Sequence, residues 1–376
     1  MIKDIKNLLD KKNKNLTVFL TILLILVTFL FIFKAYINAN AIGGSVDFPQ
    51  FYYLSKDFWA GKDIFDTYPD KKGMPMWNHI FYIIFYPFTL LPFEISKILW
   101  FFSNVIFAGV IVILLKKAYN LSLNKSLILG LLTVSSTPFT NTLGNGQLGL
   151  FILMSLIFYW HSKSKIKRFF LAIAYIKFSF APFFLINSLF KKEIDLIYAM
   201  IISALAVIFY GFYVNELNII QFINPLLTIL SIDKKVFIGD GHNFHIRSLF
   251  SIFGLLKYYS IAIVCLGIFN LINIFSIKKI NNLLFLIISI SSLFIFYHNY
   301  YDLVFLIPLA GYLLKSNISN FIFIINFPII LFFFYFVRFN QLLLDGYIPE
   351  YFINIMGSLL LIISYISLTY ENIKNK

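Results

Sequence analysis

The chain leaves its first long apolar run through the sequence Gly43-Gly44-Ser45-Val46-Asp47-Phe48-Pro49-Gln50-Phe51-Tyr52-Tyr53. The apolar run extends from Leu16 to Asn38, and a helix of that length crosses the roughly 30 Å hydrocarbon core of a bilayer. Asp47 is therefore predicted to lie where the chain leaves the membrane, followed by aromatic residues that favour the interface. A poorly solvated carboxylate there could act as a general base. The alternative is a solvated loop acid or a helix N-cap before Pro49.

The composition is that of a polytopic helical membrane protein. Of the 376 residues, 60% are hydrophobic and only 13% are charged, whereas a soluble protein carries about 25% charged residues. Solid apolar runs recur from end to end, which argues against a soluble multidomain protein and against the alternating strands of a β-barrel. The single cysteine, Cys265, provides no disulfide framework and no thiolate metal site.

The net charge of +14 follows the positive-inside rule and does not indicate nucleic-acid binding. Lysines and arginines cluster in residues 1–15 and again after several apolar runs, and these clusters are predicted to be cytoplasmic. The result is one integral membrane domain, residues 1–376, with about ten crossings and both termini inside. Residues 1–15 form a cytoplasmic tail, and residues 39–96 and 215–247 form two outer loops. The predicted spans are 16–38, about 97–115, 126–140, 146–160, 194–214, 258–277, 281–297, 301–314, 319–337 and 351–370.

Three segments are predicted to depart from simple crossings. Residues 48–60 mix aromatic and charged side chains as an amphipathic helix in the interface does, and Gly61 would end that helix. Residues 79–93 are too short to span and are predicted to be re-entrant or juxtamembrane. Residues 169–190 have basic residues at both ends, which predicts two half-helices that break near Lys177 and place this lysine deep in the membrane.

Polar residues converge on the outer side of this topology. The set combines one candidate base with hydrogen-bond donors and cations, namely Asp47, Asn145, Gln147, Lys177, His242, His245, Arg247 and His298. A base can take the proton of an acceptor hydroxyl, and cations can offset the charge on a departing phosphate. The set is therefore suited to joining an anionic lipid-linked headgroup to a hydroxyl.

Most of these residues also have a structural alternative. Lys177 could snorkel to an interface, but burial at the bilayer centre costs about 3 kcal/mol or more, which favours a functional role. Gln147 could belong to a helix-start turn, Arg247 could be an interfacial anchor, and His298 could belong to the aromatic belt. Asp302 is predicted to cap the helix that follows it.

A metal or nucleotide cofactor is not indicated. His242 and His245 are three residues apart, but only Asp240 lies near enough in sequence to add a ligand, so a structural zinc is not expected. The chain has no P-loop and no dinucleotide-binding glycine motif.

The order of several motifs resembles glycosyltransferase family 87, the polyprenyl-phosphate-sugar-dependent transferases of the GT-C class. The elements similar to those of the family are Asp47-Phe48-Pro49 with Phe51-Tyr52-Tyr53, Gly61-Lys62-Asp63-Ile64-Phe65, Tyr86-Pro87 through Asn104, Gly146-Gln147, Ile176-Lys177, and His298 to Pro308. Three departures stand out. Proline is missing after Lys177, and Trp77-Asn78-His79 replaces a common double proline. The second outer loop carries His242-Asn243-Phe244-His245, where relatives more often show a simpler Asn/Ser pattern.

The resemblance implies an inverting transfer of a mannose-like hexose or a related sugar from a polyprenyl-monophosphate donor. The acceptor would be a hydroxyl of an envelope lipid or glycan on the outer face of the cytoplasmic membrane, among membrane lipids and without a nucleotide sugar or an obligatory metal. Asp47 would be the base, Lys177 with Arg247 or His298 would hold the donor phosphate, and Gln147 would orient sugar or phosphate. Tyr52, Asn145 and His242 would line the substrate site. The alternatives are a transporter or flippase of lipid-linked saccharides and a non-catalytic envelope-assembly subunit.

Overall fold

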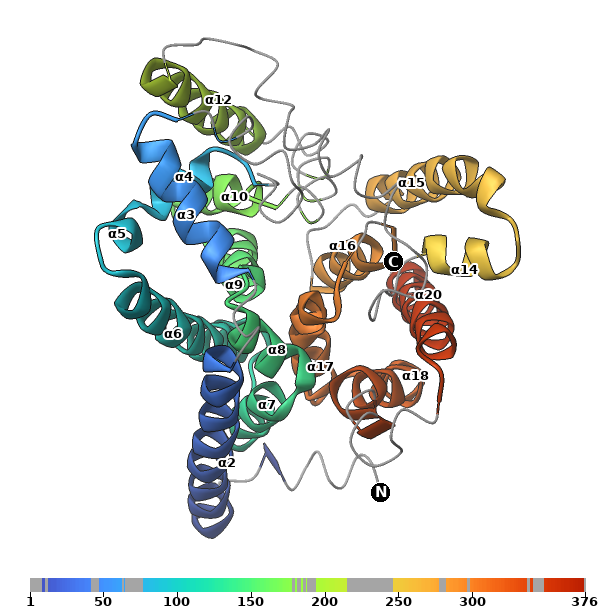
Figure 1. The fold of residues 1–376 in the computed structure, drawn as a ribbon. Helices are drawn as coiled ribbons and strands as arrows, with labels where there is room; N and C mark the ends of the chain where they lie inside the picture. Colours follow the sequence, from blue (N-terminus) through green and yellow to red (C-terminus); the bar gives the residue numbers. More distant parts are fainter. Residues whose placement is uncertain are drawn as a thin grey trace. The chain divides into compact units, whose positions relative to one another are not determined.

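The computed structural model describes residues 9–10, 13–41, 47–62, 64, 77–177, 180, 184, 187, 194–214, 246–276, 282–295, 298–336, 339–340 and 348–374. These residues are 84% helical and include no strand, which confirms the predicted all-α class (Figure 1). Most of the outer loop 215–247, with His242, His245 and Asp240, lies outside the described residues, as does most of the tail 1–15.

Long apolar helices identify a membrane-embedded protein. Four described helical stretches are long and apolar enough to cross a bilayer, namely α2 (Lys14–Asn40), α6 (Phe93–Tyr119), residues Leu256–Ile274 in η2 (Leu256–Tyr258) and α15 (Tyr259–Ser276), and α20 (Glu350–Lys374). A fifth span is possible if α8 (Thr137–Asn145) and α9 (Gly149–His161), bent by 115°, count together. The predicted count of about ten crossings is therefore not confirmed.

Several predicted spans fold as shorter apolar helices, which explains the difference in count. The remaining described elements are α3 (Phe48–Trp59), α4 (Ile80–Ile84), α5 (Tyr86–Thr89), α7 (Leu123–Ser135), α10 (Lys167–Ala174), α12 (Asp195–Val214), α14 (Ile246–Ile252), α16 (Asn282–Ile295), η3 (Tyr300–Leu306), α17 (Ile307–Leu313), α18 (Asn320–Leu331) and the π-helical η4 (Phe332–Phe336). Their apolar stretches are short of the roughly 20 residues that a straight helical span needs.

The chain divides into two compact units. Unit 1 comprises Met1–Ala35, Ala108–Thr142 and Phe237–Lys376, and unit 2 comprises Tyr36–Phe107 and Leu143–Val236. The two boundaries at residues 35 and 107 fall inside α2 and α6. The candidate residues Asp47, Tyr52, Asn145, Gln147 and Lys177 belong to unit 2.

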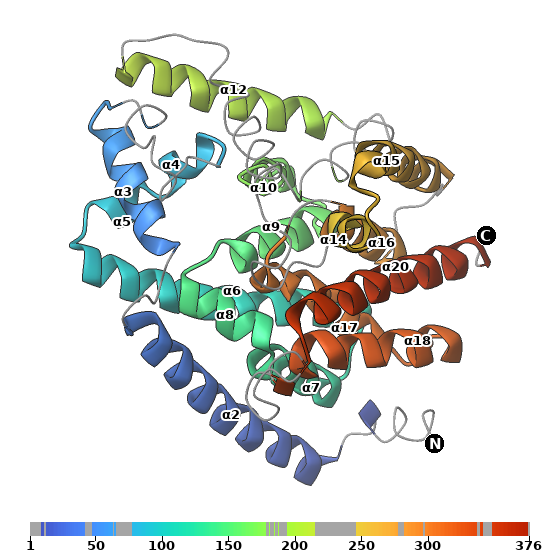
Figure 2. The same ribbon diagram turned by 45° about the vertical axis from the view of Figure 1, so that its right-hand side comes forward.

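In unit 1, buried polar side chains join helices that are otherwise apolar. Helices α18 and α20 pack side by side, as both views show (Figures 1 and 2). Between them, the Asn326 side-chain amide donates to Ser367 Oγ at 2.9 Å and accepts from the Ser364 hydroxyl. Interhelical hydrogen bonds of this kind stabilise helix packing inside a membrane.

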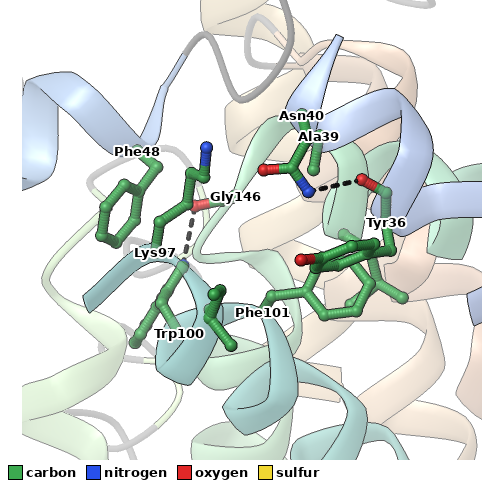
Figure 3. Close-up of a pocket in the computed structure, with 10 residues that line it drawn as sticks. Tyr36, Ala39, Asn40, Phe48, Lys97, Trp100, Phe101 and Gly146 are labelled. Carbon is green, nitrogen blue, oxygen red and sulfur yellow. Dashed lines mark hydrogen bonds between the residues drawn. The ribbon is translucent and has the colours of Figure 1, made fainter. Parts of the chain in front are cut away.

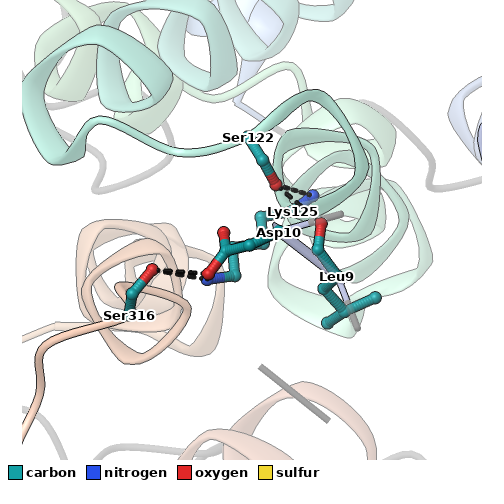
Figure 4. A network of polar contacts seen from close by, with 5 residues as sticks. All are labelled: Leu9, Asp10, Ser122, Lys125 and Ser316. Atoms are coloured by element: carbon teal, nitrogen blue, oxygen red, sulfur yellow. Dashed lines mark hydrogen bonds and ion pairs between the residues drawn. The ribbon is translucent and has the colours of Figure 1, made fainter. Parts of the chain in front are cut away.

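A second set of polar contacts in unit 1 connects Leu9 and Asp10, near the N-terminus, to the start of α7. The Lys125 ammonium is 1% exposed and lies 2.7 Å from Asp10 Oδ2 and 2.8 Å from Ser316 Oγ (Figure 4). The Ser122 hydroxyl caps α7 and donates to the Leu9 carbonyl at 2.9 Å. Partial burial raises the pKa of Asp10, but hydrogen bonds from Lys125 and Ser316 outweigh it and hold that pKa below its usual value.

In unit 2, an aromatic core surrounds α3. The helix buries Phe48, Phe51 and Phe58, and it ends before Gly61, whose φ of 73° is readily adopted only by glycine. The structure thus confirms the predicted amphipathic helix. Residues 79–93 form only the short helices α4 and α5, in agreement with a segment that does not cross.

Candidate functional site

Asp47 occupies the N-cap position of α3, yet its side chain does not cap the helix. Its backbone amide donates to the Asn145 carbonyl at 3.2 Å, and its own carbonyl accepts from the Phe51 amide at 3.2 Å. Pro49 in the first turn favours a helix start here, because its ring fixes φ and it has no amide to satisfy. The local sequence therefore accounts for the helix start without using the Asp47 carboxylate.

The turn after α8 lies directly against the start of α3. Gly146 has a φ of +71°, and a Cβ at this position would lie 2.7 Å from the Phe48 Cβ. The Gly146 carbonyl accepts a hydrogen bond from Trp100 Nε1 at 2.8 Å (Figure 3). Only glycine allows both this backbone conformation and this approach. We call this meeting of α3, α6 and the Gly146 turn the Asp47 junction.

The junction brings together the acid and the amides that the sequence predicted. Asn145 is bonded to Asp47 through the backbone and is half-buried, and Gln147 follows in the same turn with only 5% of its surface exposed. Tyr52, one turn further along α3 than Phe48, is 4% exposed. Its hydroxyl donates to the Leu91 carbonyl at 2.8 Å, so this side chain also helps to hold the segment before α6.

Lys177 lies just beyond the end of a short helix. Helix α10 ends at Ala174, three residues before Lys177, which agrees with the predicted helix break. The Ile176 carbonyl accepts a hydrogen bond from the Asn78 amide at 3.2 Å, and the Lys177 ammonium lies 5.4 Å from the Phe180 ring centroid. The Trp77-Asn78-His79 segment, noted above as a departure from the family, therefore packs against the Lys177 turn.

A continuous set of contacts within unit 2 leads from Asp47 to Lys177. Phe51 lies one turn after Asp47, and its ring meets Trp77 at 4.7 Å in an edge-to-face contact. Asn78 follows Trp77 and is bonded to Ile176, the residue before Lys177. Aromatic packing and one backbone hydrogen bond thus connect the two segments that carry the candidate base and the candidate phosphate ligand.

Two residues that lie beside these segments were not singled out by sequence reasoning. His79 is 1% exposed, and its ring lies 4.9 Å from that of Tyr210. Lys97, in α6, contributes to a narrow crevice beside the Asp47 junction, together with Phe48 and Gly146 (Figure 3). A lysine at the start of a predicted span, three residues before a tryptophan, is the signal that could have identified Lys97.

The other predicted phosphate ligands belong to unit 1. Arg247 lies in α14, with its guanidinium 5.8 Å from the Tyr259 ring. His298 is 2% exposed, and its Nδ1 lies 3.0 Å from Asp302 Oδ2. Asp302 also accepts the Asn299 amide at 3.3 Å as part of a capping box at the start of η3, which confirms its predicted capping role. The same carboxylate orients the His298 ring.

Among the residues that the structure describes, no three His, Cys, Asp or Glu side chains come together as ligands for a metal ion. His242, His245 and Asp240 lie outside these residues.

Comparison with known proteins assigns a family to the chain. The sequence model of glycosyltransferase family 87 matches residues 79–294, more than half of the chain. This range includes Asn145, Gln147, Lys177 and Arg247, while Asp47 and His298 lie outside it. No curated protein and no solved structure matches.

Proposed function

The chain belongs to glycosyltransferase family 87 and is a glycosyltransferase, and we propose that it moves a mannose-like hexose or a related sugar from a polyprenyl-monophosphate donor. The acceptor is a hydroxyl group of an envelope lipid or glycan. The reaction takes place on the outer face of the cell membrane and uses neither a nucleotide sugar nor a resident cofactor.

The Asp47 junction is the observation that supports this proposal. The Asp47 carboxylate is half-buried, is not used to cap α3, and is held beside Asn145 and Gln147 by a backbone hydrogen bond and by the Gly146 turn. A half-buried carboxylate held at this place by its backbone is a candidate for the base that takes the acceptor proton. The amides of Asn145 and Gln147 provide the donors and acceptors that a sugar ring needs.

In the proposed reaction, Asp47 accepts the proton of the acceptor hydroxyl as the hydroxyl oxygen bonds to the anomeric carbon of the donor sugar. The bond between that carbon and the phosphate oxygen breaks, and polyprenyl phosphate leaves with the electron pair. Lys177 stabilises the negative charge that accumulates on this phosphate. Arg247 and His298 stay sequence-based candidates for the same task, and the proposal does not depend on them.

The direct test is transfer by the purified full-length protein in lipid, supplied with a panel of polyprenyl-phosphate sugars and envelope acceptors. Asp47→Asn should lower kcat by about 100-fold or more, because general bases contribute roughly 10²–10⁴-fold. The matched control is Asp57→Asn, which removes a carboxylate from the same helix that instead pairs with Lys62.

Wild-type transfer by Asp47→Asn would remove the base assignment. If neither the wild type nor Asp47→Asn transfers sugar, but the protein moves a lipid-linked saccharide across liposome membranes, the transporter alternative is favoured. Both variants should keep the wild-type thermal unfolding temperature, so that a loss of activity reports on chemistry and not on folding.

A further inference from the structure

The end of helix α18 departs from regular α-helical geometry. Pro328 lies inside α18, where it has no amide to donate to the helix, and the chain continues into the π-helical turn η4. Turns of this kind are rare in proteins and frequently lie at functional sites. The contacts that η4 makes are therefore a guide to function in unit 1.

Side chains from two other elements bind the backbone of η4. The hydroxyl of Tyr300, in η3, donates to the Phe333 carbonyl. The hydroxyl of Thr137, at the start of α8, donates to the Phe334 carbonyl at 2.9 Å. Carbonyls near the end of a helical stretch take partners from other parts of the chain, and inside a membrane these partners must come from the protein. The turn η4 thus provides two acceptors to which neighbouring elements are fastened.

Tyr300 belongs to the turn that follows His298, and this turn is held at several points. Its first residues form the capping box at the start of η3. The Thr142 hydroxyl donates to the carbonyl of Tyr301 at 3.1 Å. The turn leads through η3 into α17, which packs against α18 (Figures 1 and 2). The bond from Tyr300 to η4 therefore connects the His298 turn to the irregular end of α18.

Hydrogen bonds between helices can also stabilise packing in a membrane without any part in a reaction. The Ser135 hydroxyl, which lies 2.8 Å from the Tyr335 hydroxyl of η4, is a contact of this kind, because it joins two side chains. The bond from Tyr300 differs, because it fixes the backbone two residues from His298. The His298 ring is 2% exposed and lies against Asp302. A ring held so closely moves with its turn, and a shift of about 1 Å in a group that contacts substrate can cost roughly 100-fold.

We propose that Tyr300 is a positioning residue for the transfer reaction. Its bond to η4 fixes the turn that carries His298, so that the imidazole contacts the phosphate of the sugar donor. In this proposal Tyr300 acts through His298 and does not touch the substrate, and Thr137 supports it by holding the next carbonyl of η4. The inference rests on the proposed function and on His298 as a ligand of the donor phosphate.

The first experiment is the transfer assay with the purified full-length protein in lipid, with the donor and acceptor concentrations varied separately. Tyr300→Phe keeps the ring and removes only the hydroxyl. It should raise KM for the donor about tenfold and leave KM for the acceptor unchanged, because it displaces a donor ligand. Thr137→Val should cause a smaller rise in the donor KM. The matched control is Ser135→Ala, which removes a hydroxyl that contacts a side chain of η4 and not its backbone, and it should behave like the wild type.

A double-mutant cycle shows whether Tyr300 acts through His298. His298→Gln should itself raise the donor KM, and the addition of Tyr300→Phe should raise it no further. Additive effects of the two substitutions would overturn the inference, because Tyr300 would then act independently of His298. A rise in both KM values together with a lower unfolding temperature would equally overturn it, since that result is expected of a contact that only stabilises the fold.

A ¹⁵N-histidine spectrum separates this inference from the proposed function. The His298 signal is identified by its loss in His298→Gln. Tyr300→Phe should shift this signal, and Ser135→Ala should not. If the shift is observed in a protein that transfers nothing, the fastening of the His298 turn is supported and the proposed function is refuted. If the protein transfers sugar but Tyr300→Phe changes neither the signal nor the donor KM, the inference is refuted and the transferase stands.

Discussion

Replacing Gly146 by alanine should disturb the candidate site. The new Cβ would lie 2.7 Å from the Phe48 Cβ, and the two atoms must separate to at least 3.4 Å to reach ordinary contact. Phe48 begins α3, so the helix start must shift, and with it the backbone hydrogen bond from Asp47 to Asn145. The substitution therefore acts directly on the position of the candidate base.

Two costs combine in this variant. A left-handed backbone costs an alanine about 1 kcal/mol more than glycine, and forcing a methyl group into a packed contact costs about 1–3 kcal/mol. The expected destabilisation is thus about 2–4 kcal/mol. Because a shift of about 1 Å in a catalytic group can cost roughly 100-fold, we expect kcat to fall by one to two orders of magnitude in the molecules that remain folded.

Thermal unfolding in detergent and the transfer assay would measure the two effects. Gly146→Asn separates them, since asparagine tolerates the left-handed region but carries the same Cβ. If contact with Phe48 dominates, Gly146→Asn should be as damaging as Gly146→Ala. Gly267→Ala is the control, because a Cβ there meets nothing within 4 Å. Unchanged stability and activity in Gly146→Ala would refute the close approach on which the Asp47 junction rests.

Two further predictions concern unit 1. Asp302→Asn should lower stability by about 1 kcal/mol by weakening the capping box and should change the imidazole nitrogen shifts of His298 in a ¹⁵N-histidine spectrum. A shift pattern equal to that of the wild type would contradict the orienting contact. Asp10→Asn should cost about 1 kcal/mol at neutral pH, a modest value because Asp10 is 36% exposed and screened by water. Since contact with Lys125 holds the folded-state pKa of Asp10 below 3.8, this difference should be complete above about pH 5 and vanish in more acidic solution. A constant difference in melting temperature from pH 7 to pH 3 would refute it.

Local sequence signals predicted the elements that build the candidate site. Pro49 and Gly61 indicated the ends of α3, because proline favours a helix start and glycine adopts the positive φ that follows a helix end. The break before Lys177 was also predicted, since a segment with basic residues at both ends cannot cross simply. Each of these signals depends only on residues that are close together in the chain, so it can be recognised in a single sequence.

The meeting of Asp47 with the Gly146 turn could be expected only in part. The topology placed both on the outer side, but nothing in the sequence indicated that Gly146 approaches Phe48 closely enough to exclude a Cβ. A contact between residues nearly 100 positions apart depends on how α3, α6 and α8 pack. The place of Lys97 in the crevice beside the Asp47 junction was missed for the same reason, because it results from that packing.

The predicted number of crossings is not confirmed, because hydropathy measures the composition of a segment and not the length of the helix that it forms. Runs rich in Phe and Ile, such as residues 281–297 and 319–337, have the apolar character of a span but fold as helices too short to qualify. Short apolar helices can be buried among other helices as well as cross a membrane. Residues Leu283–Ile295 of α16 are all buried, which is typical of a core helix and unlike the largely exposed α2.

This contrast between α16 and α2 bears on how an acceptor could reach the candidate site. Helix α2 has only 6% of its most apolar window buried, so a bilayer must cover most of its surface. Its last turns, with Tyr36 and Asn40, nevertheless line the crevice that contains Lys97. Because the crevice shares Phe48 and Gly146 with the Asp47 junction, we expect an acceptor with an apolar tail to approach the candidate site along the exposed face of α2.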